Sequence, residues 1–304
     1  MNKKLYFENN LKNLSIIRDT GDTIEQVEYL CPLCMRSIPM TKAKDELTEE
    51  HVPQASLGGH KKTLTCSNCN SVCGSDIDVH LLNAIECLEW RSFLYGTDRK
   101  VFIQDGKKRL NATLKVGKNK ELLLNVDTNR NNPQVWNYFH DNILLENAII
   151  DAQDKSLKRD QRRISAAILK NAYLILFAKT GYAFLADTYY DNIRTQIMNP
   201  SPFILPERLW TFQNVSVQDG IYLTQDNRYR GFFVIYTLKR REAYRVCVLI
   251  PTPIVDYLSA CKGLRTIEPH MPIRILLLPD EDYLCDVTAI DRLKRWCYGW
   301  RLDF

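Results

Sequence analysis

Two Cys-x-x-Cys pairs constrain this chain more than any other feature. The first pair is Cys31 and Cys34 and the second is Cys66 and Cys69, whereas six further cysteines are scattered without paired spacing. Each pair can hold a tetrahedral ion from a tight turn, and four thiolates close such a site. A redox motif would explain one pair but not two. The spacing therefore predicts one structural Zn²⁺ ion held by all four thiols.

Composition sets wider limits. The 304 residues are 45% hydrophobic and 25% charged, which is typical of a globular protein. No run of 18 apolar residues occurs, so we expect no membrane span, and the first residues lack the apolar core of a secretory signal. We therefore expect a cytoplasmic protein, in which a metal site is favoured over disulfides. A net charge of +5 permits a nucleic-acid partner without requiring one.

The stretch between the cysteine pairs holds the polar residues of interest. It reads "EEHVPQASLGGHKKTLTCSNCN" over residues 49–70, with Glu50-His51 before a proline, then Gly58-Gly59, then the second pair and Asn70. Together with the first pair, Gly74 and Asp78, this order resembles the HNH endonuclease family over residues 29–85. The chain departs from many members by reading "HKKTL" after Gly-Gly, where they carry an asparagine that braces the loop.

The resemblance implies a ββα-metal fold and a role for each polar residue. His51 would be the general base that takes a proton from water, and Glu50 and Asn70 would hold a catalytic Mg²⁺ or Mn²⁺ ion. Neighbouring residues of a strand face opposite sides, so we expect Glu50 and His51 at a strand end. Some members of the family place a further ligand one helical turn after the first. Here that position, four residues after Asn70, is Gly74, which cannot ligate, so we expect two protein ligands. For Asp78, capping the following helix is favoured over a third ligand position.

We predict an α+β protein in which a zinc-stabilised ββα-metal module precedes a larger mixed domain. The predicted divisions are an N-terminal arm or short helix at 1–28, the nuclease module at 29–96, and an α+β domain at 97–304 that binds substrate, a partner or a sensor ligand. Periodicity and turn residues predict the following elements: a helix at 79–95, a meander at 100–127, two helices within 155–197 ended by Gly181 and before Pro200, a hairpin at 230–251 and a buried strand at 273–279.

Four basic clusters with nearby aromatic residues are candidates for contact with nucleic acid. They lie at 107–120, 157–163, 238–245 and 292–301, and the last alternates basic residues with Trp296, Tyr298 and Trp300. Lysine and arginine bind phosphates, and exposed rings stack on unpaired bases. A solvated charged face with core aromatics is the alternative for each cluster, and the sequence does not choose among the four.

The function expected from these features is hydrolysis of phosphodiester bonds in double-stranded DNA by a metal-dependent HNH endonuclease. Bacterial restriction or antiviral defence is the setting that the resemblance implies. Two alternatives stay open: a non-catalytic zinc-knuckle protein that binds and regulates nucleic acid, and an RNA-cleaving nuclease. The sequence also leaves open a homo-oligomer or a partner protein.

Overall fold

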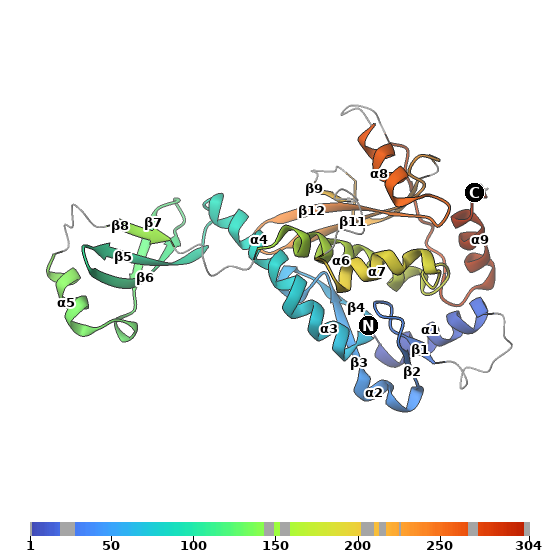
Figure 1. Cartoon of the computed structure of the whole chain (residues 1–304), viewed down its shortest axis with the longest axis horizontal. Coiled ribbons are helices and arrows are strands. Elements are labelled where there is room, and N and C mark those ends of the chain that lie inside the picture. Colours follow the sequence, from blue (N-terminus) through green and yellow to red (C-terminus); the bar gives the residue numbers. More distant parts are fainter. Residues whose placement is uncertain are drawn as a thin grey trace. The chain divides into compact units, whose positions relative to one another are not determined.

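The computed structural model describes residues 2–18, 28–142, 149–152, 159–201, 210–212, 217–224, 226–266 and 273–300. The chain forms two compact units (Figure 1). Unit 1 combines residues 1–81 with 160–304, and unit 2 consists of residues 82–159. This division differs from the boundary expected at 96/97. The expected boundary was placed where helical periodicity changes to strand periodicity, and that change lies inside unit 2. The chain leaves unit 1 between residues 81 and 82, inside a continuous helix, so the sequence pattern shows no break there.

The N-terminal part of unit 1 is built from short elements around one hairpin. These are α1 (Lys3–Arg18), β1 (Tyr29–Leu30), β2 (Ser37–Ile38), α2 (Ala43–Glu46), β3 (Leu47–Val52), β4 (His60–Cys66) and α3 (Ser67–Cys73). A π-helical turn at Gly74–Asp78 follows α3 and leads into α4 (Val79–Arg91), which begins in unit 1 and continues into unit 2. β1 pairs with β2, and β3 pairs with β4, both antiparallel. The helix α1 buries Phe7, Leu11 and Leu14, so the predicted N-terminal arm is part of the core.

The C-terminal part of unit 1 contributes a five-stranded sheet and its helices. The elements are α6 (Gln161–Thr180), α7 (Asp191–Met198), β9 (Trp210–Phe212), β10 (Gly220–Thr224), β11 (Gly231–Lys239), β12 (Ala243–Pro251), α8 (Tyr257–Arg265), β13 (Leu276–Leu277) and α9 (Val287–Cys297). The strand order is β13-β10-β11-β12-β9, and each pairing is antiparallel.

The helix α6 joins these two parts. Thirteen of its 20 residues are buried, on several sides of the helix. It contacts β3 and β4 on one side and β11 and β12 on another (Figure 1). A helix that is apolar nearly all round is stable only inside a core. α6 therefore fixes the N-terminal hairpin against the C-terminal sheet within one unit.

Unit 2 has a core of its own. Its sheet has the order β7-β6-β5-β8, formed by β5 (Asp98–Asp105), β6 (Lys108–Val116), β7 (Leu122–Val126) and β8 (Ile149–Ala152), and α5 (Pro133–Asp141) packs on it through Phe139. Val101, Leu110 and Leu114 are buried beneath that helix. The alternation of apolar residues along β5 and β6 thus buries one face of the sheet.

Most elements expected from the sequence are confirmed. The meander, the two helices ended at Gly181 and before Pro200, and the hairpin at 230–251 all form. One prediction is wrong in both length and burial. The strand expected at 273–279 forms only at Leu276–Leu277, and both residues are exposed because β13 lies at the sheet edge. Within the described residues, no helix has both the length and the apolar character to cross a membrane.

Candidate functional site

Four cysteines meet in unit 1 although the outer two, Cys31 and Cys69, are 38 positions apart in sequence. The Sγ atoms of Cys31, Cys34, Cys66 and Cys69 all lie within 4.8 Å of one another. Thiolates at about 2.3 Å from a tetrahedral zinc ion are about 3.8 Å apart. The Sγ atoms of Cys34 and Cys66 are 3.8 Å apart. The four thiols thus have the spacing of ligands to a single metal ion.

Backbone hydrogen bonds hold these thiols in place. The amide of Cys66 donates to Sγ of Cys31 over 3.3 Å, and the amide of Cys69 donates to Sγ of Cys66 over 3.4 Å. Hydrogen bonding to Cys34 and to the second pair, with burial added, raises the pKa of the Cys31 thiol. Four crowded thiols cannot all ionise without a compensating cation, which a bound metal ion would supply.

The second cysteine pair also begins the helix that follows the hairpin. Cys66 is the last residue of β4 and the N-cap of α3, so the cluster fixes the start of that helix. The order along the chain is therefore strand β3, strand β4, helix α3 (Figure 1). Asn70 lies in the first turns of α3, and its Nδ2 donates to Oγ1 of Thr48 on β3 over 2.9 Å.

A register shift separates the two residues at the centre of β3. Glu50 pairs with Thr63, whereas His51 pairs with Lys61, so one residue of β4 is skipped between them. Glu50 is only 3% exposed, while His51 is half-buried. A bulge of this kind changes where the following side chain points. Glu50 and His51 were expected at a strand end, and they are the fourth and fifth of the six residues of β3, which ends at Val52.

The carboxylate of Glu50 faces an ammonium group from α6. Nζ of Lys170 lies 2.9 Å from Oε1 of Glu50 and 2.6 Å from Oδ2 of Asp78. The second oxygen of Glu50 accepts from Oγ1 of Thr65 over 3.3 Å. The side chain of Lys170 is 0% exposed, and both carboxylates are buried. Two acids and one base thus share a buried site.

The electrostatics of this triad follow from burial and charge. Burial by itself lowers the pKa of Lys170, but the carboxylates of Asp78 and Glu50 outweigh it, and the pKa is raised. Burial raises the pKa of Asp78, which the nearby Lys170 opposes and Glu50 reinforces. Lys170 therefore carries its charge at neutral pH. Oδ1 of Asp78 is buried without a hydrogen bond, so the triad leaves one acidic oxygen unsatisfied.

This arrangement bears on the expected catalytic cation. Both oxygens of Glu50 already have partners, and the amide nitrogen of Asn70 is bound to Thr48. A hard divalent cation needs free oxygen ligands and several waters. Because both oxygens of Glu50 are engaged, the expected pair of Glu50 and Asn70, as it is folded, does not suit such an ion. Asp78 does not cap α4 as expected, because it lies inside the π-helical turn and its side chain binds Lys170.

Lys170 is the residue that the sequence analysis missed. It follows "ISAAIL" and precedes a further apolar run in the same helix, so a single charge lies among buried positions. A lysine at such a position needs a buried partner, because an unpaired buried charge is costly. That pattern was a signal that acidic residues elsewhere in the chain would meet it.

The structure distinguishes three of the four basic clusters, at 107–120, 238–245 and 292–301, by their surroundings. Cluster 107–120 belongs to unit 2, and Trp296 in cluster 292–301 is 0% exposed, so that ring is in the core. The turn after β11 lies beside the candidate site. A Cβ atom on Gly58, in the hairpin turn, would lie 3.0 Å from both Cβ and the carbonyl oxygen of Lys239. Lys239 therefore lies next to the turn of the hairpin that carries His51.

Comparison with protein-family models, with curated proteins and with solved structures gave no match for this chain. The findings on fold are therefore those of the structure itself: a mixed α+β protein with a cluster of four cysteines within metal-binding distance.

Proposed function

We propose that this protein is a zinc-stabilised endonuclease of HNH type, which hydrolyses phosphodiester bonds of double-stranded DNA in the cytoplasm. Zn²⁺ would be structural and held by Cys31, Cys34, Cys66 and Cys69. Its four thiolate ligands would leave no coordination position for water, so the ion would supply folding energy and no chemistry.

One observation carries the proposal. The bulge in β3 buries Glu50 and leaves the next residue, His51, half-buried, on a hairpin that leads directly into the helix started by the cysteine cluster. A neutral imidazole that reaches solvent can accept a proton from an attacking water. A position held by a closed metal cluster and a bulge is rigid, as a general base requires.

Positive charge near His51 supports a nucleic-acid substrate. Lys61 pairs with His51 across the hairpin, and Lys239 lies against the hairpin turn. Both lysines are exposed, although Lys61 also contacts Glu49 over 2.5 Å. Lysines at such positions bind the phosphate backbone independently of base sequence. We therefore assign to Lys61 and Lys239 the task of holding a phosphate beside His51.

The proposed chemistry does not pass through Mg²⁺ or Mn²⁺. The ion pair of Glu50 with Lys170 occupies the carboxylate that the resemblance gives to that cation. The same observation favours a second candidate function, a non-catalytic protein that binds nucleic acid through its zinc-stabilised hairpin. In that case His51 would be a surface residue without a chemical role.

Plasmid cleavage tests the proposal and separates the two candidates. Wild type and His51→Ala would be incubated with supercoiled DNA, linear duplex, single strands and RNA, each with Mg²⁺, with Mn²⁺ and with neither. Zinc content and thermal melting of both proteins serve as controls for folding. The nuclease proposal expects one zinc ion in each protein and cleavage of duplex DNA by the wild type alone.

Three outcomes would contradict all or part of the proposal. Equal cleavage by both proteins would remove His51 from the chemistry. DNA binding without cleavage under every condition would establish the non-catalytic candidate. Cleavage confined to RNA would replace the substrate class while keeping the role of His51.

A further inference from the structure

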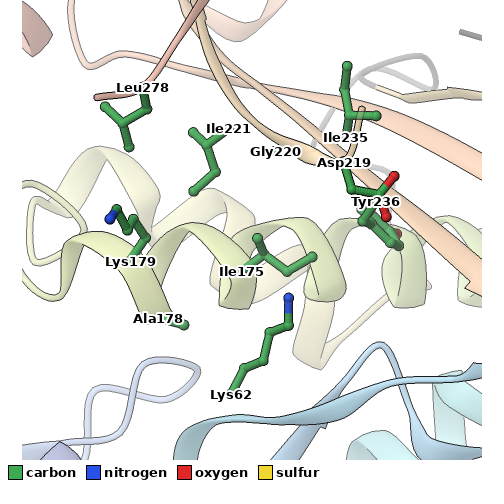
Figure 2. A pocket seen from close by; sticks show the side chains of 10 residues that line it. All are labelled: Lys62, Ile175, Ala178, Lys179, Asp219, Gly220, Ile221, Ile235, Tyr236 and Leu278. Atoms are coloured by element: carbon green, nitrogen blue, oxygen red, sulfur yellow. The ribbon is translucent and has the colours of Figure 1, made fainter. Parts of the chain in front are cut away.

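A cavity lies within unit 1 between the hairpin, α6 and the five-stranded sheet. Its volume is about 420 Å³. Lys62 of β4 borders it on one side, Ile175 and Ala178 of α6 form its base, and Ile221 and Ile235 of the sheet lie opposite (Figure 2). Sites for small molecules fall in this range of volume and occur where several elements meet.

The lining of this cavity is mainly aliphatic. Ile175, Ala178, Ile221, Ile235 and Leu278 all line it. Tyr236 adds a ring, but its hydroxyl already donates to the carbonyl oxygen of Ile168 over 2.8 Å. The walls therefore offer apolar contact area and few hydrogen bonds, which suits a hydrocarbon body and does not suit a sugar or a nucleobase.

The charges at the border of the cavity are predominantly positive. Lys62 forms no ion pair with any residue in the part of the chain that the structure describes, and its amino group points from β4 toward Ile175 (Figure 2). Lys179 is bound to Asp280 over 2.7 Å. The one acidic lining residue, Asp219, lies 3.4 Å from Nε of Arg245 and accepts from Thr237. The exposed ammonium group of Lys62 is therefore available to an anionic ligand group.

We propose that this cavity binds a small amphipathic carboxylate, with a medium alkyl chain on the isoleucine surface and the acid group on Lys62. The site does not depend on the nuclease proposal, because none of its lining residues belongs to the cysteine cluster or to the Glu50–Lys170–Asp78 triad. The ligand would touch β4, α6 and the sheet together, so its binding would stabilise the packing of the hairpin on the C-terminal part of unit 1.

Isothermal titration of the full chain with decanoate tests the proposal. Decanol and decyltrimethylammonium, which carry the same alkyl chain with no charge and with a positive charge, are the matched ligands. We expect decanoate to bind with a Kd below about 1 mM, as a ligand of that size allows. The neutral ligand should bind about tenfold more weakly and the cationic one not at all.

Variants locate the binding. Lys62→Met removes the charge from an exposed position and should weaken decanoate binding about tenfold, without affecting decanol. Ala178→Phe fills the cavity and should abolish binding of both. Lys61→Met is the control on the same strand, because Lys61 does not line the cavity.

The proposal is overturned by any of three results. These are no heat of binding up to the solubility of decanoate, equal affinity for the cationic ligand, and an affinity that Lys62→Met leaves unchanged. Because Lys62 is exposed, that variant keeps the test valid even if Ala178→Phe fails to fold.

Discussion

Nζ of Lys170 lies 2.9 Å from Oε1 of Glu50, although the two residues are 120 positions apart. The same ammonium binds Asp78 over 2.6 Å, so one lysine of α6 connects β3 to the π-helical turn after α3. A buried charge that loses its partner is strongly destabilising, whereas the complete pair adds little net stability. The triad therefore acts mainly to fix how the hairpin packs on α6.

Lys170→Met tests this connection. We expect the free energy of unfolding to fall by about 3–5 kcal/mol, because two buried carboxylates lose their counter-ion. Urea denaturation measures the change. Lys179→Met removes a half-exposed lysine from the same helix and should have little effect. In the double variant Lys170→Met/Glu50→Gln, part of the loss should be recovered, since one of the uncompensated charges is gone. A loss no larger than that of Lys179→Met would show that the triad does not form.

Removal of one thiol tests the metal cluster. Cys69→Ser should reduce bound zinc from one ion per chain to none or to weak occupancy, and the hairpin should lose protection from hydrogen exchange, because structural zinc supplies on the order of 10 kcal/mol. Mass spectrometry with elemental analysis measures both effects. Cys285→Ser is the matched control, as that half-buried cysteine lies outside the cluster. Equal zinc content in both variants would exclude the cluster as the binding site.

The raised pKa of Asp78 gives a pH dependence of known sign. A carboxyl whose pKa is higher in the folded state binds protons more tightly there than in the unfolded chain. Its contribution to stability is therefore greatest at low pH, and it is lost as pH rises from about 3.9, the unfolded value, through the raised folded value. Asp78→Asn should remove this decline, whatever its effect on the absolute stability. Unfolding free energies measured between pH 3 and pH 8 for both proteins check the slope, and parallel curves would contradict the prediction.

Alanine substitutions at two glycines, Gly59 and Gly74, test the geometry of the hairpin turn. A Cβ atom on Gly59 would lie 1.3 Å from the carbonyl oxygen of Pro53, whereas one on Gly74 would meet nothing within 4 Å. Gly59→Ala should therefore destabilise by at least about 2 kcal/mol, because backbone must move. Gly74→Ala, in a right-handed helical conformation, should stabilise by about 0.4–1 kcal/mol. Thermal melting compares the two, and equal effects would mean that the turn is folded differently.

The position of Lys239 predicts the salt dependence of DNA binding. Lys239→Ala should weaken binding to all duplexes alike and lower the slope of log K against log salt by about 1. Lys118→Ala removes the same charge from an exposed turn of unit 2 and is the control. Fluorescence anisotropy at several salt concentrations measures both. A larger change for Lys118→Ala would move the DNA-binding surface to unit 2.

Local sequence patterns were sufficient to predict most helices and strands and the cluster of four cysteines. The turn residues Gly106 and Gly181 and the alternation along 100–116 fix conformation over a few residues, so the meander and the end of α6 follow directly from the sequence. The four thiols were identified because Cys-x-x-Cys restricts each pair to one turn. Two such turns need only be brought together for the cluster to form.

Long-range packing decided which residues surround Glu50 and which basic cluster lies beside the hairpin. The sequence identified Glu50 as a candidate ligand, but only the fold brings Lys170 to it and engages both of its oxygens. Likewise, the sequence listed four basic clusters without preference, and the contact between Gly58 and Lys239 places one of them beside the hairpin of His51. Spacing along the chain reports on neighbours within a turn or a strand. It contains no signal for which helix will supply a buried charge, because that depends on how the elements share one core.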